Sequence, residues 1–147
     1  MKKLLHTLLL FAVGLFAACQ APTSGGDVYL NDFLDDLTAQ TDAGPAIRAA
    51  LSHCARIRAA RLILPGGELR IRPDLAVEKY QFISNNDESL KRIAFDLVGM
   101  RDFEIDGNGT ELLFTGFISP FSLEDCENIT VLSLIHISEP TRQEAIS

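Results

Sequence analysis

The chain of 147 residues contains no tryptophan, two tyrosines, three cysteines and three histidines. No cysteine or histidine lies at a spacing typical of a zinc site, so the sequence shows no metal-ligand motif and we expect no cofactor. Basic residues are also in the minority, with 13 Lys and Arg against 20 Asp and Glu and a formal net charge of −7. Because nucleic-acid binding depends on Lys and Arg that neutralise phosphates, this balance argues against a nucleic-acid partner.

The N-terminal segment has the pattern of a secretory signal. Lys2 and Lys3 precede an apolar run over residues 4–18, which is too short for a confident membrane span. The small residues before Cys19 resemble a bacterial lipobox, in which the cysteine thiol is acylated after cleavage. We therefore expect a lipoprotein signal peptide at 1–18 and a tether at 19–26. The protein would be exported to the cell envelope, in the periplasm or at the outer membrane or cell surface, with only its lipid in the membrane. The alternative is an ordinary secretory signal with Cys19 lost or unmodified.

The C-terminal residues 132–147 differ in character from the segment before them. The stretch LSLIHISEPTR can be encoded by a nucleotide sequence that matches a common transposase library adapter. We therefore predict that 132–147 is a non-native tail, and we give His136, Glu139 and Arg142 no functional weight. The alternative is a genuine polar tail.

Between residues 93 and 131 the chain repeats itself with an offset of 26 positions. Apolar residues alternate with polar ones inside each copy, which is typical of strands. A period of this length indicates stacked supersecondary units, none of which can bury its apolar face alone. The repeat predicts a solenoid of short strands in which matched residues lie side by side. The matched pairs are Phe95 with Phe121, Leu97 with Leu123, Met100 with Cys126, Phe103 with Ile129, and Ile105 with Val131.

Tight corners are predicted where glycine and asparagine follow a strand. Asp106, Gly107, Asn108 and Gly109 are residue types that tolerate positive φ or bond their own backbone, so we expect them to form a structural turn. Ile105 before this turn and the apolar residues Leu112 and Phe114 after it should face a common interior.

One amphipathic helix is predicted before the repeat. Ile47, Ala50, Leu51, Cys54 and Ile57 have helical spacing, and Pro45 lies near the start, where its missing N–H is tolerated. We expect this helix, about 43–58, to cover the open end of the first coil. Two short strands, 61–64 and 68–72, should follow it.

Several of these motifs resemble a known family. The runs DVYLNDF, EKYQFISNNDESLKRIAFDLVG and IDGNGTELLFTGFISPF, followed by NITV, are similar to the N-terminal region of glycoside hydrolase family 110. The resemblance covers residues 27–131. It implies an all-β solenoid, namely the N-terminal coils of a truncated right-handed parallel β-helix of the pectate-lyase-like kind. The family contains exo-acting α-1,3-galactosidases, so the resemblance implies hydrolysis of terminal α-galactosyl residues of glycans.

Glycoside hydrolysis uses two carboxylates, which an inverting enzyme holds about 6.5–9.5 Å apart to admit a water. The acidic residues of the repeat are also what any solvated outer face displays. The resemblance implies an inverting scheme whose acids lie on later coils, so we expect no catalytic residue in this chain and no turnover by it. The candidates that this expectation sets aside are Asp102, Glu104, Asp106, Glu124, Asp125 and Glu127.

Cys54 and Cys126 occupy apolar positions of the helix and of the repeat, so we expect free thiols and no disulfide. Two other functions remain open. The chain could come from another β-helix enzyme, such as a polysaccharide hydrolase or lyase. It could also come from a noncatalytic β-helix that binds glycans at the surface. Fold alone does not separate these possibilities.

Overall fold

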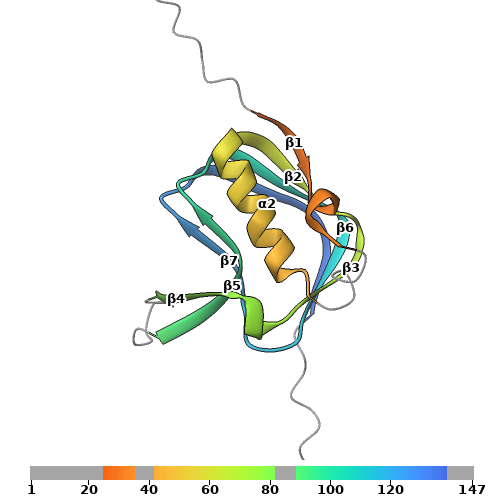
Figure 1. The fold of residues 1–147 in the computed structure, drawn as a ribbon, viewed down its shortest axis with the longest axis vertical. Helices are drawn as coiled ribbons and strands as arrows, with labels where there is room; N and C mark the ends of the chain where they lie inside the picture. Colours follow the sequence, from red (N-terminus) through yellow and green to blue (C-terminus); the bar gives the residue numbers. More distant parts are fainter. Residues whose placement is uncertain (1–24, 36–41, 82–88, 139–147) are drawn as a thin grey trace, which may run out of the picture.

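The computed structural model describes residues 25–35, 42–81 and 89–138. Most of these residues lie in strands, and this part of the chain contains a single α-helix (Figure 1). The elements are β1 (Gly25–Tyr29), η1 (Leu30–Phe33), α2 (Gly44–Ile57), β2 (Ala59–Ile63), β3 (Gly67–Ile71), η2 (Pro73–Leu75), β4 (Val77–Gln81), β5 (Ser89–Val98), β6 (Arg101–Phe114), β7 (Ser119–Glu124) and β8 (Glu127–Ser138).

Two sheets contain these strands, and nearly all pairs are parallel. In the first sheet the long strand β6 pairs with β2 along its first half and with β3 along its second half, while β1 extends the sheet beside β2. Strand β8 lies on the other side of β6. In the second sheet β5 pairs in parallel with β7, and β4 pairs antiparallel with the first half of β5. Each turn of the chain therefore lies beside the one before it.

The predicted register of the repeat is confirmed for four of the five pairs, while Met100 and Cys126 lie between the paired stretches of the two sheets. Phe95 pairs with Phe121 and Leu97 with Leu123 in the second sheet. Phe103 pairs with Ile129 and Ile105 with Val131 in the first. The rings of Phe95 and Phe121 stack with centroids 5.0 Å apart. The first member of each pair is buried, but Leu123 is 54% exposed because no further turn of chain covers it in the described residues.

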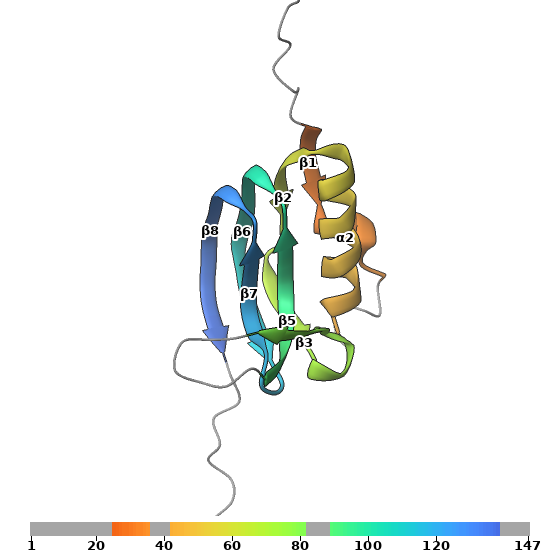
Figure 2. The same ribbon diagram turned by 90° about the vertical axis from the view of Figure 1, so that its left-hand side faces the viewer.

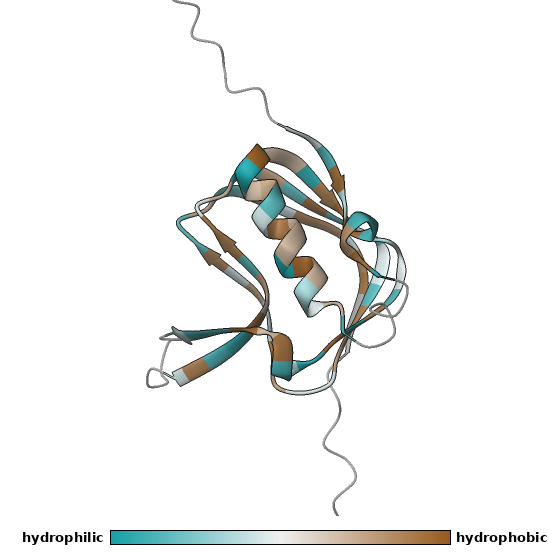
Figure 3. Cartoon of the chain, in the orientation of Figure 1, coloured by the Kyte–Doolittle hydropathy of each residue, from teal (hydrophilic) through white to brown (hydrophobic). Residues whose placement is uncertain are grey.

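Helix α2 lies where the apolar spacing predicts it. Its buried residues include Ile47, Ala50, Leu51 and Cys54. Figure 3 shows that hydrophobic and hydrophilic residues alternate along the helix and the strands. Arg58 ends the helix in the left-handed conformation, with φ of 54°. Figure 2 shows α2 at one end of the stack and β8 at the other. The helix thus covers one end of the core, as predicted.

The N-terminal end of α2 is fixed by a buried carboxylate. Oδ1 of Asp42 accepts hydrogen bonds from the backbone N–H of Gly44 at 2.9 Å and from that of Arg72 at 3.2 Å. Asp42 therefore ties the first turn of the helix to the end of β3, and it satisfies one of the orphan N–H groups of the helix.

The corner of β6 differs from the prediction in one respect. Asp106 accepts a hydrogen bond from the N–H of Asn108 at 2.9 Å, as a turn-forming aspartate does. Positive φ occurs at Asn108 (47°) and Gly109 (75°), but not at Gly107. Of these residues, Gly107 therefore does not use the positive φ that glycine tolerates. A Cβ at Gly107 would lie 2.7 Å from the carbonyl oxygen of Ser133, so glycine is needed there for the close approach of β8.

Strand β8 continues past residue 131 into the segment predicted to be non-native. The 26-residue offset holds as far as the pair Asp106 and Leu132, and the register then shifts, so that Thr110 pairs with Leu134 and Glu111 with His136. An extended segment of almost any sequence can pair with a free strand edge, because the hydrogen bonds are made by backbone groups. The signal peptide, Cys19 and residues 139–147 lie outside the described residues.

Replacement of Phe95 by Ala should lower the free energy of unfolding by about 3–5 kcal/mol, because a fully buried ring that stacks on Phe121 is removed. Phe117→Ala is the matched control, since Phe117 is 89% exposed and its loss should change stability by at most about 0.5 kcal/mol. Urea denaturation followed by circular dichroism measures both. Equal effects of the two substitutions would refute the stacked interior.

The chain should self-associate as its concentration rises. The last turn of chain exposes Val131 and Leu132 together with the free edge of β8, and such an edge pairs with other chains. Light scattering coupled to size exclusion should show oligomers, and Val131→Lys should reduce them. A monodisperse monomer at all concentrations would contradict this expectation.

Candidate functional site

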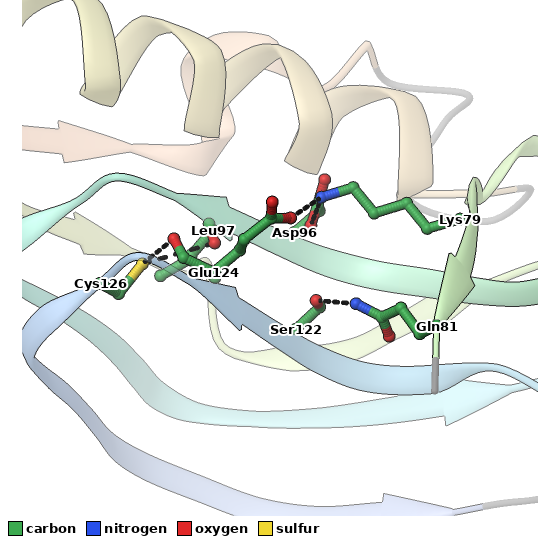
Figure 4. A network of polar contacts seen from close by, with 7 residues as sticks. All are labelled: Lys79, Gln81, Asp96, Leu97, Ser122, Glu124 and Cys126. Carbon is green, nitrogen blue, oxygen red and sulfur yellow. Dashed lines mark hydrogen bonds and ion pairs between the residues drawn. The ribbon is translucent and has the colours of Figure 1, made fainter. Parts of the chain in front are cut away.

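The densest polar cluster in the described residues lies on the second sheet (Figure 4). The ammonium group of Lys79 on β4 contacts Asp96 Oδ1 on β5 at 2.8 Å and Glu124 Oε2 on β7 at 3.1 Å. Beside it, the amide of Gln81 donates to the hydroxyl of Ser122 at 2.7 Å. Side chains from three adjacent strands therefore converge on one lysine.

Electrostatics in this cluster favour charged groups that neutralise each other. The hydrogen bond to Asp96 raises the pKa of Lys79, and a smaller contribution comes from Glu124. Asp96 is the more enclosed of the two carboxylates, since its side chain is 14% exposed. The charges of Lys79, Asp96 and Glu124 therefore offset one another across three neighbouring strands.

The remaining candidate carboxylates are separated from one another by partners of their own. Asp102 accepts a hydrogen bond from Asn128 at 2.7 Å, and Glu104 lies 3.5 Å from Arg61. Glu127 pairs with Arg101. Asp106 bonds the backbone of its own corner, and Asp125 is an exposed corner residue with φ of 52°. Asp102, Glu104, Asp106 and Glu127 thus each contact a neighbouring side chain or backbone group.

Several of these contacts join one turn of chain to the next. Arg61 on β2 bonds Asp27 on β1 at 2.7 Å and also faces Glu104 on β6. The hydrogen bond from Arg61 lowers the pKa of Asp27, and the same bond raises the pKa of Arg61. Parallel pairing places these side chains side by side on the outer face. Their ordered arrangement is thus explained by stacking and requires no catalytic function.

The two cysteines of the described residues are free, as predicted. Cys54 is fully buried on α2, and burial raises the pKa of its thiol to about 11. Cys126 is half-buried, and its sulfur lies 3.4 Å from the carbonyl oxygen of Leu97. His53 contacts Arg56 and the ring of Phe33.

Sequence reasoning missed Lys79 and Asp96. Lys79 lies before the repeat, and its distance from Asp96 in space depends on the direction of β4, which the sequence does not reveal. A signal was available in Asp96 itself. Asp96 is a charged residue that lies between the two apolar residues Phe95 and Leu97. Its counterpart one repeat later, Ser122, carries no charge.

Within the described ranges, no group of three or more His, Cys, Asp or Glu residues is arranged to hold a metal ion. The helices of the same ranges include none that is long and apolar enough to cross a bilayer.

Comparison with known proteins finds relatives of one kind. A protein named alpha-1,3-galactosidase A from Bacteroides fragilis is 31% identical over 151 residues, which is 98% of this chain and 25% of the relative. A protein of the same name from Shewanella woodyi is 32% identical over 104 residues, or 71% of this chain and 17% of the relative. Alpha-1,3-galactosidase B from Parabacteroides distasonis is 36% identical over 92 residues, covering 59% and 15%. The chain thus spans a quarter or less of the length of these curated relatives. No family model matches it.

Cys126 should react with Ellman's reagent in the native protein, whereas Cys54 should react only after unfolding, because it is fully buried. A Cys19→Ser variant leaves these two thiols to be counted.

The raised pKa of Cys54 has a second consequence. The unfolded thiol ionises above about pH 9 and the folded thiol only near 11, so stability should fall as pH rises across this window. Rapid labelling of both thiols at pH 8 would contradict the placement of Cys54.

Proposed function

We propose that this chain, a homologue of the alpha-1,3-galactosidases A and B, is the N-terminal part of an exported glycoside hydrolase that releases terminal α-1,3-linked galactose from glycans. The observation that carries the proposal is sequence identity above 30% to several proteins of that name across most of the chain. The glycan substrate and the activity belong to the whole protein, of which this chain spans a minor part.

The architecture we propose is the first coils of a right-handed parallel β-helix. Three features support it: parallel pairing of successive strands, a constant 26-residue offset between β5 and β7 and through the first half of β6 and β8, and a helix over one end. Such a solenoid continues by addition of further coils to its open end, here β7 and β8.

We propose that residues 132–147 are a foreign tail, since their codons can match a library adapter. The register of β8 supports this inference, because the 26-residue offset is lost from Leu134 onward. We also infer that Cys19 is acylated and that the lipid holds the protein at the envelope membrane. The charged residues Lys2 and Lys3, the apolar run and the small residues before Cys19 support that step.

The chemistry we propose is the inverting scheme. One carboxylic acid would protonate the glycosidic oxygen, and a carboxylate on the other side would activate a water that attacks the anomeric carbon. The general acid must be protonated, which a neighbouring cation disfavours, and the general base must have a free oxygen directed at the water. Because Asp96, Glu124, Glu104 and Glu127 each lie against a cation, we place both catalytic groups on coils beyond this chain.

The natural gene, read past the codon for Val131, should encode further coils, and its product should release galactose from a Galα1-3Gal disaccharide. Galactose dehydrogenase coupled to NADH formation measures the release, and the anomer formed first, seen by NMR, should be inverted. The present chain, assayed at equal concentration, should release none. A complete gene product that leaves the disaccharide intact would refute the proposed activity, and release by the present chain would refute the placement of the catalytic acids.

A further inference from the structure

A pocket of about 350 Å³ lies between α2 and β5. It exists because the two strands beside β5 pair with different parts of it. On one side β7 pairs with β5 as far as Val98. On the other side β4 pairs only with residues 89–93, so residues 94–98 have no strand beside them in the described part of the chain. Helix α2 covers this stretch incompletely, and the space left between them is the pocket.

The pocket is too narrow for an added strand. Neighbouring strands lie about 4.8 Å apart. A strand inserted between β5 and α2 would therefore need close to twice that distance between these two elements. The Cα atoms of α2 already lie within 8 Å of those of β5. An extended peptide would therefore have to displace the helix, whereas a molecule the size of one sugar ring fits, since small-molecule sites begin at about 300 Å³.

The lining combines an apolar surface with a few polar groups. Leu51, Ala94 and Met100 are buried residues that supply the apolar part. Ser52 and Arg48 of α2 and Asp96 of β5 supply the polar part. This is the composition of a specific small-molecule site, in which apolar contacts give affinity and a small number of polar groups give orientation.

The polar groups retain bonding capacity. Asp96 uses Oδ1 for Lys79, which fixes the carboxylate in place, and its Oδ2 has no partner among the described residues. Arg48 uses one N–H for the carbonyl oxygen of Leu75, and four remain. Ser52 is exposed, and no partner of its hydroxyl lies in the described ranges. The pocket thus offers an acceptor, several donors and a hydroxyl.

The two charged groups of the lining have opposite signs. A simple anion could pair with Arg48 but not with Asp96, and a simple cation could pair with Asp96 but not with Arg48. A neutral polyol satisfies both, because each hydroxyl donates and accepts. A pyranose ring also has C–H groups that can lie on Leu51 and Met100.

We propose that the pocket between α2 and β5 binds one neutral hexopyranose residue, with Asp96 and Arg48 as its polar contacts. That the ligand is a sugar of a glycan, and not another polyol, rests on the proposed function. It would hold a sugar of the substrate glycan away from the coils that carry the chemistry, and so it would be an accessory binding site.

Ala55→Phe tests the proposal, because Ala55 is an exposed residue of α2 that lines the pocket. Ala49→Phe is the matched control, since Ala49 is an exposed residue of the same helix and does not line the pocket. The probe is methyl α-D-galactopyranoside, and saturation-transfer difference NMR on the full 147-residue chain reports its binding. Circular dichroism confirms that both variants keep the helix.

We expect a saturation-transfer signal with the unchanged chain and with Ala49→Phe, and at least a fivefold smaller signal with Ala55→Phe. Asp96→Asn should weaken binding severalfold without abolishing it. Absence of binding to the unchanged chain, or equal binding by all variants, would overturn the proposal. Either result is separate from the fate of the proposed function, because hydrolysis is measured on the complete gene product and binding on this chain.

Discussion

Parallel backbone pairing between successive turns of chain is the constraint on which the rest of the structure depends. Once β5 pairs with β7 and β6 with β8 at a fixed offset, every side chain lies beside its counterpart one turn away. Apolar counterparts then form a continuous interior, as Phe95 and Phe121 do. A residue at the end of the stack has a neighbour on one side only, which is why Leu97 is buried and Leu123 is not.

The same constraint accounts for the polar surface and for the corners. An outward-facing side chain also lies beside its counterpart in the next turn of chain. Two residues of like charge in these positions would repel each other, so positive and negative residues have to alternate from one turn to the next. Arg61 between Asp27 and Glu104, and Arg101 beside Glu127, meet this requirement. Corners repeat as well. Gly66 and Gly109 both have φ between 70° and 80° in successive turns, since a bend must occur at the same level for the strands on either side to remain paired.

Features that follow from the repeat could be predicted from the sequence. The register of Phe103 with Ile129, the burial of Leu112 and Phe114, and the position of α2 all reflect periodic apolar residues. Features without a repeat partner could not be predicted. The antiparallel direction of β4 depends on how the chain returns from η2, because its alternating side chains suit either direction. Lys79 reaches Asp96 only as a result of that direction. The role of Gly107 was misassigned because its glycine is required by the closeness of β8 and not by its own φ.

Stacking also limits where chemistry can occur. A catalytic acid needs a raised pKa, and a catalytic base needs an open approach to water, so the two must have different surroundings. A regular stack gives each carboxylate similar surroundings and, in this chain, a nearby cation or amide. Departures from regular stacking are therefore the places to expect binding or catalysis. A departure of this kind occurs at β4, which pairs with only the first half of β5 and leaves a pocket beside Asp96.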